Sequence, residues 1–115
     1  MTQTVSQTID KGNDLLGMRV EVHGFFVMNK RAAYFAESLD ERENHAACLR
    51  VDIDNLRKLI LPRVLPRVGG AYQFSDEARI VALLNRDESG EFAFKLGGVE
   101  QFEINKLDEW RSVIP

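Results

Sequence analysis

The chain has 115 residues, 44% of them apolar and 29% charged, and a formal net charge of -3. This length predicts one domain with its own core, and the mild acidity argues against a surface built to hold nucleic-acid phosphates. The single cysteine, Cys48, excludes an internal disulfide. No apolar run approaches the roughly 20 residues that cross a bilayer, and the first residues lack the features of a secretory signal, so we expect a cytoplasmic protein without membrane contacts.

Residues 1–16 are polar except near their end, and we expect an N-terminal arm or short helix there. A strand is predicted from about Met18 to Met28, because apolar and polar residues alternate along it. Gly24 interrupts this alternation, and a glycine inside a strand usually marks a bulge or a sharp bend. The strand is therefore expected to bend in its middle and to belong to two sheets at once, as in a small closed barrel.

A polar turn at residues 29–31 and an aromatic run at 32–36 predict a hairpin with the first strand. After a charged loop, the clean alternation over residues 47–53 predicts a third strand. Asp54 is expected to cap a short helix, because its carboxylate can accept from the free amides of a first turn. Pro62 should end that helix after about two turns, since proline disfavours helical geometry in the residue before it.

The second half of the chain predicts two longer strands. The expected elements, in chain order, are a short strand (71–74), a turn (75–77), a strand (78–84), a hairpin turn (87–90), a last strand bent at Gly97 and Gly98, and a C-terminal tail (107–115). Val81 and Leu83 make the outward face of the strand at 78–84 apolar as well, so we expect that face to be partly covered.

The order of strand, strand, strand, short helix, strand, strand resembles the OB-fold, a five-stranded Greek-key barrel. The residues that carry the resemblance are the bent strand Val20–Phe25, the pair Tyr34-Phe35, and the helix Asp54–Leu61 before Gly69-Gly70-Ala71-Tyr72. The resemblance implies a mainly β fold in which residues 17–106 form the barrel. Because OB-folds often bind oligonucleotides or oligosaccharides, it also implies a possible ligand-binding face.

Residues suited to catalysis or metal binding are scarce. His45 and Cys48 are the nearest approach to a metal half-site, but zinc would need two further ligands, and His23 is the only other histidine. Cys48 as a nucleophile and His45 as its base would be poor partners, because their side chains would project to opposite faces of a strand. The glycine pairs at 69–70 and 97–98 lack the lysine of a phosphate loop. We therefore predict a protein that is not an enzyme and uses no cofactor or metal.

Single-stranded nucleic-acid binding is one functional hypothesis, because aromatic side chains on the open face of a barrel can stack on bases. Acidic residues such as Glu21 and Asp52 lie on the same strands and would repel phosphates. The residues predicted to make such contacts are Arg19, Phe25, Arg31, Tyr34, Arg50 and Tyr72.

The preferred hypothesis is a non-enzymatic protein-binding module. In size, charge and lack of catalytic groups, the chain resembles the immunity proteins that bacteria keep against toxins, although it shares no motif with them. Such a protein would neutralise a basic toxin domain by docking an acidic surface around an aromatic anchor. The predicted contacts are Asp40, Glu41, Glu43, Asp87, Glu88, Glu91, Glu100, Glu103 and Trp110.

A third hypothesis is a small accessory or dimerising subunit, which would use an exposed strand edge or the apolar face at Val81 and Leu83. The stretch between Asn55 and Asp76 contains no acidic residue. Its four basic residues are expected to form an ordinary solvated face: Arg57, Lys58, Arg63 and Arg67.

Overall fold

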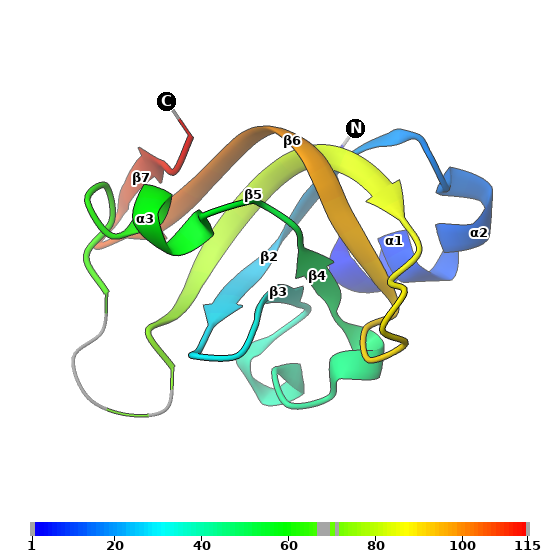
Figure 1. The fold of residues 1–115 in the computed structure, drawn as a ribbon, viewed down its shortest axis with the longest axis horizontal. Helices are drawn as coiled ribbons and strands as arrows, with labels where there is room; N and C mark the ends of the chain where they lie inside the picture. Colours follow the sequence, from blue (N-terminus) through cyan, green and yellow to red (C-terminus); the bar gives the residue numbers. More distant parts are fainter. Residues whose placement is uncertain (1, 67–69, 71, 115) are drawn as a thin grey trace.

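The computed structural model describes residues 2–66, 70 and 72–114 of the chain. Five strands form a closed barrel, and Figure 1 shows how they wrap around one core. In chain order the barrel strands are β2 (Arg19–Met28), β3 (Ala33–Ala36), β4 (Leu49–Val51), β5 (Phe74–Asn85) and β6 (Phe94–Lys106). Arg67, Gly69 and Ala71, which belong to the predicted basic stretch and to the start of the next predicted strand, lie outside the described residues.

Antiparallel pairs join β2 to β3, β3 to β4, β5 to β6, and β2 to β5. The parallel pair of β4 and β6 completes the barrel. The helix α3 (Leu56–Ile60) lies between β4 and β5, the third and fourth barrel strands. The predicted mainly β barrel with a short helix at this position is thus confirmed, and the fold is consistent with the OB-fold resemblance.

Alternation along the strands places the core as predicted. The β5 residues predicted to face inward, Ala78, Ile80, Ala82 and Leu84, are buried. Aromatic rings fill the centre of the barrel, where Phe26 makes an edge-on contact with Phe102 at 5.0 Å between centroids. On the outward face of β5, Val81 is buried but Leu83 is exposed, so that face is covered only in part.

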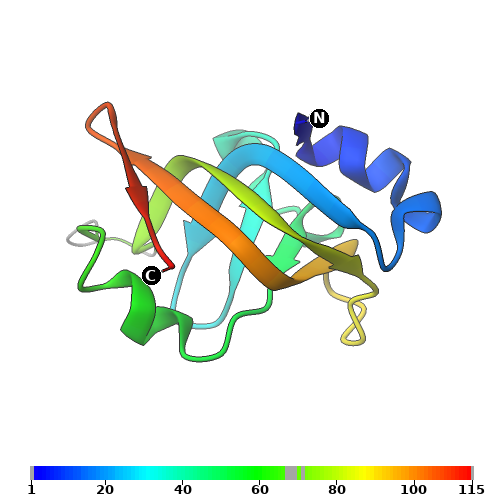
Figure 2. The ribbon, with the colours of Figure 1, turned by 90° about the horizontal axis from the view of Figure 1, so that it is seen from above.

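Close packing requires a glycine at position 24, and no bulge interrupts β2 there, so of the two expectations for Gly24 the bulge is wrong. The ladder between β2 and β5 runs from Arg19 to Met28 without a shift of register. A Cβ at Gly24 would lie 2.8 Å from both the Ala36 carbonyl oxygen and a methyl group of Val5. Figure 2 shows that β2 curves as it crosses the barrel.

Within the predicted N-terminal arm, the chain forms β1 (Thr2–Thr4), α1 (Val5–Asp10) and α2 (Gly12–Leu15). Thr4 and Gln7 make a capping box, in which each side chain accepts from the other's backbone N–H. β1 pairs in parallel with Glu21–His23, on the edge of β2 that β3 leaves free. Val5 is buried against Gly24.

Within the predicted C-terminal tail, Glu109–Ser112 form β7, which pairs with the end of β6. Val113 follows and is fully buried, and its N–H donates to the Phe102 carbonyl at 2.8 Å. The end of the chain therefore contributes to the core. None of the helices in the described part of the chain is long and apolar enough to span a membrane.

Two further local predictions are wrong. Asp54 does not cap α3: the N-cap is Asn55, whose left-handed φ of 58° turns the chain into the helix without a side-chain cap. Residues 75–77 are not a turn, because β5 is continuous from Phe74 and pairs there with β2. The polar side chains in this segment are held across the sheet instead, as Lys106 bonds to Asp76 at 3.1 Å.

The third barrel strand is shorter than predicted. Residues His45–Ala47 form a 3-10 turn, and β4 covers only Leu49–Val51. The predicted bend at Gly97 and Gly98 is present: the ladder of β5 and β6 shifts register between Val81 and Leu83, and Gly98 has a φ of +52°.

Candidate functional site

The predicted acidic contacts lie on two separate surfaces. Those of the β3–β4 connection and of the loop between β5 and β6 belong to two loops that touch through His45 and Glu91, and we call them the loop surface: Asp40, Glu41, Glu43, Glu88 and Glu91. The other predicted partner contacts, two acidic residues and the predicted aromatic anchor, lie on the strands β6 and β7, and we call them the sheet surface: Glu100, Glu103 and Trp110.

His45 joins the two loops of the loop surface. Its Nδ1 lies 2.5 Å from the Glu91 Oε2, and its ring stacks on Phe92 with centroids 4.8 Å apart and planes 18° apart. Tyr34 packs edge-on against His45 at 4.8 Å. Segments far apart in the sequence are thus held side by side by one aromatic cluster. Sequence analysis considered His45 only as a poor metal ligand or a poor base for Cys48, and it missed this role.

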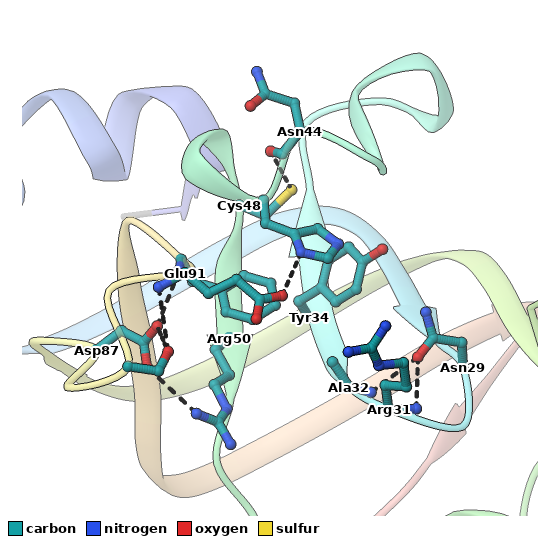
Figure 3. Close-up of polar contacts among 12 residues, drawn as sticks. Asn29, Arg31, Ala32, Tyr34, Asn44, Cys48, Arg50, Asp87 and Glu91 are labelled. Atoms are coloured by element: carbon teal, nitrogen blue, oxygen red, sulfur yellow. Dashed lines mark hydrogen bonds and ion pairs between the residues drawn. The ribbon is translucent and has the colours of Figure 1, made fainter.

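A small second core lies beneath the β3–β4 connection, on the outside of the barrel: Val27, Tyr34, Ala36, Cys48 and Phe92. The Tyr34 hydroxyl donates to the Arg42 carbonyl at 2.6 Å. The Cys48 thiol donates to the Asn44 carbonyl at 3.3 Å (Figure 3). Burial raises the pKa of Tyr34 well above its ordinary value and the pKa of Cys48 to about 11. These bonds fasten the connection over the outer face of β3 and β4.

A depression of about 400 Å³ opens beside this cluster. Its lining residues include Asn29, Arg31, Glu43, His45, Tyr72 and Glu91. The Tyr72 hydroxyl donates to the Glu43 carboxylate at 2.9 Å. The pKa of Tyr72 is raised, chiefly because the phenol is partly buried and secondly because the Glu43 carboxylate accepts its proton in this hydrogen bond. The Asn29 side chain accepts from the N–H groups of Arg31 and Ala32 at 2.8 and 2.9 Å, which shapes the turn at the rim (Figure 3).

Asp87 organises the loop between β5 and β6, and its side chain is only 1% exposed. It accepts hydrogen bonds from the Ser89 hydroxyl at 2.6 Å, the Phe92 N–H at 2.9 Å and the Arg50 guanidinium at 3.4 Å. Partial burial alone would raise the pKa of Asp87, but these hydrogen bonds outweigh it and lower the pKa. The predicted partner contact at Asp87 is therefore corrected to a structural role inside the loop, and Figure 3 shows it bonded to Arg50.

Glu103 and Trp110 of the sheet surface line a second depression, of about 410 Å³. Arg79 spans it: the guanidinium donates to Glu103 at 2.7 Å and lies 4.2 Å from the centre of the Trp110 ring. His23 lies 3.1 Å from Glu77 on the neighbouring strand. Arg79 and His23 were not predicted as site residues, although both stand at outward positions of alternating strands.

The residues predicted to bind nucleic acid do not form one face. Arg31, Arg50 and Tyr72 lie near the loop surface, whereas Arg19 forms an ion pair with Glu100 on β6. Phe25 is half-buried on β2 between Ala36 and Glu77. Tyr34 is fully buried beneath the β3–β4 connection, so its ring is not available to a base.

Among the described residues, no group of three or more His, Cys, Asp or Glu side chains is placed to hold a metal ion. No protein-family model, curated protein or solved structure matches this chain.

Proposed function

We propose that this protein is a non-enzymatic protein-binding module that docks a basic partner through the loop surface. The observation that carries the proposal is the contact between two acidic loops, which the bond between His45 and Glu91 joins. In its more specific form, the proposal is an immunity-type protein that neutralises a basic toxin domain. The exposed carboxylates would steer such a partner, and the half-buried Tyr72 beside them would supply an aromatic anchor.

The filled outer face of β3 and β4 favours a protein partner over a nucleic acid. In an OB-fold this face usually offers open aromatic rings to bases. Here Tyr34 and Phe92 are buried, and His45 lies over Phe92. The carboxylates of Glu43 and Glu91 line the adjacent depression and would repel phosphates.

The test is a measurement of association rates with the product of the neighbouring reading frame, at low and high ionic strength. The variant Asp40→Lys/Glu41→Lys/Glu88→Lys reverses exposed charges on both loops and leaves in place the carboxylates that hold His45 and Tyr72. We expect the association rate at low salt to fall about tenfold and the dissociation rate to change little, because steering acts before contact.

The matched control reverses three exposed charges away from the loop surface: Glu100→Lys, Asp108→Lys and Glu109→Lys. An equal loss of association rate in this control would show that net charge, and not the loop surface, drives binding. Labelled single-stranded DNA, titrated under the same two conditions, tests the alternative function. Binding with a steep salt dependence would support nucleic-acid recognition instead.

A further inference from the structure

The strand β7 has one edge that no strand in the described part of the chain covers. It pairs with the end of β6, and no described strand lies along its other edge (Figure 2). Its four residues, Glu109–Ser112, are all exposed. An uncovered edge presents main-chain N–H and C=O groups with which another strand can pair. A further strand can therefore be added to the sheet at β7.

The ladder between β6 and β7 determines which main-chain groups face outward. Lys106 pairs with Glu109 across a two-residue turn, and such a turn is closed by a hydrogen-bonded pair. Bonded and non-bonded pairs then alternate along an antiparallel ladder. The bond from the Val113 N–H to the Phe102 carbonyl is in phase with this alternation. The N–H and C=O groups of Trp110, which belongs to a non-bonded pair, therefore point away from β6.

Only one antiparallel register between two copies of β7 brings opposite charges together. The outward main-chain groups belong to Trp110 and, by the same alternation, to Ser112. A two-fold axis at Trp110 sets Glu109 opposite Arg111 of the second copy, and the reverse. An axis at Arg111 sets the two arginines opposite one another, which is destabilising. An axis at Ser112 sets Arg111 opposite Val113 and gains no charge pair.

The ion pair inside β7 is compatible with this complementarity. The Arg111 guanidinium bonds to the Glu109 carboxylate of the same copy at 2.9 Å, so each copy brings a neutral pair to the edge. An axis at Trp110 lays the two pairs head to tail. Because a guanidinium has several N–H donors, each Arg111 can then hold the carboxylates of both copies. The register therefore needs no net charge on either copy.

We propose that two copies of this chain dimerise edge to edge through β7, with Trp110 at the two-fold axis. The Trp110 side chain lies on the opposite face of β7 from Glu109 and Arg111, so the two rings come beside one another at the axis. Each ring contacts Arg79 and lines the depression of about 410 Å³. The dimer thus places both depressions on one side of a continuous sheet.

This inference is independent of the proposed function. The loop surface adjoins the start of β6, whereas β7 pairs with Glu103–Lys106 at its end. A second copy fits the edge better than an unrelated strand, because the sequence of β7 complements itself about Trp110.

The test is sedimentation equilibrium of the full chain from about 10 μM to about 1 mM, a range suited to a small contact. The decisive variants are Glu109→Arg and Arg111→Glu, because each alone sets like charges opposite one another on both sides of the axis. Each should raise the dissociation constant of the dimer about tenfold or more. An equimolar mixture of the two variants should form a heterodimer in the concentration range of the parent, since every crossing then joins opposite charges.

The matched control is Asp10→Arg, which makes the same change of charge as Glu109→Arg at an exposed position on α1 and should leave the dissociation constant unchanged. A parent that stays monomeric up to about 1 mM overturns the proposal. A dimer that both single variants leave intact also overturns it, because it would be formed by another surface. If the single variants dissociate but their mixture does not associate, charge pairing across β7 is excluded as well.

Discussion

Gly24 shows how much of a residue's role depends on a neighbour that the sequence does not reveal. Its place in an alternating strand predicts that a side chain is not tolerated there. The structural cause is the approach of Val5, from a segment whose polar sequence predicts only an arm, to within 2.8 Å of the position of a Cβ. Alternation identifies the face of a residue, but it does not identify what packs against that face.

Gly24→Ala should therefore destabilise the protein by about 2 kcal/mol, because the added methyl group overlaps both Val5 and the rigid carbonyl of Ala36. Gly97→Ala is the matched control, since its Cβ would make only an ordinary contact at 3.7 Å with Asn85. The control should stay within about 0.5 kcal/mol of the parent in urea unfolding. Equal destabilisation of the two variants would contradict this account of Gly24.

Tyr34 illustrates the same limit for a site residue. It does point outward from β3, as the predicted base-stacking role requires. However, the connection from β3 to β4 folds back over it and fixes its hydroxyl to the Arg42 carbonyl. A charged loop gives no signal that its backbone will serve as a cover, so the face of Tyr34 was predictable and its burial was not.

At the level of elements, the loop between β5 and β6 is built around one carboxylate. Sequence analysis correctly predicted a turn at residues 87–90, where the Gly90 N–H bonds to the Asp87 carbonyl at 3.1 Å. It did not predict that the Asp87 side chain turns inward, because an Asp in a charged turn usually faces water. By contrast, the start of β5 was misjudged for a local reason. Residues 75–77 are polar and resemble a turn, and only the side-chain partners of Asp76 and Glu77 on β6 explain why they lie in a strand.

Asp87→Asn should remove a part of the pH dependence of stability. The pKa of Asp87 is lowered in the folded protein, so its stabilising effect is complete above the unfolded value of about 4 and is lost as the pH falls through the lower folded value. The free energy of unfolding of the parent should fall more steeply below pH ~4 than that of the variant. At neutral pH the variant should be less stable by about 1 kcal/mol.

Asp10→Asn removes an exposed carboxylate from α1 and provides the control for this measurement. Its curve of unfolding free energy against pH should follow that of the parent. Parallel curves for Asp87→Asn and the parent would show that the hydrogen bonds to Asp87 do not stabilise the ionised carboxylate.

For the whole molecule, the barrel was predictable because each of its strands carries its own signal in alternation and turn residues. The additions at its two ends were not. β1 has three residues, and β7 has four residues that are all exposed, so neither shows an apolar period. Both are nevertheless integral to the barrel, because β1 leads to buried Val5 and β7 leads to buried Val113.

The chain should accordingly unfold in a single cooperative transition. Trp110 on β7 reports on the C-terminal hairpin, and far-ultraviolet circular dichroism reports on the barrel as a whole. We expect urea midpoints from Trp110 fluorescence and from circular dichroism to coincide, because Val113 ties the hairpin to the core. An earlier fluorescence midpoint would show that the hairpin detaches before the barrel opens.

The paired strands β2 and β5 are far apart in the sequence, since Val20 lies opposite Ala82 in their ladder. During synthesis, β2 therefore leaves the ribosome long before β5. Until β5 follows, the apolar side of β2 has no barrel to enter and stays in contact with water. Pairing at such a distance along the chain also slows folding, since a long loop must close before the contacts form. We therefore expect the nascent protein to be exposed to aggregation in the interval between translation of these two strands.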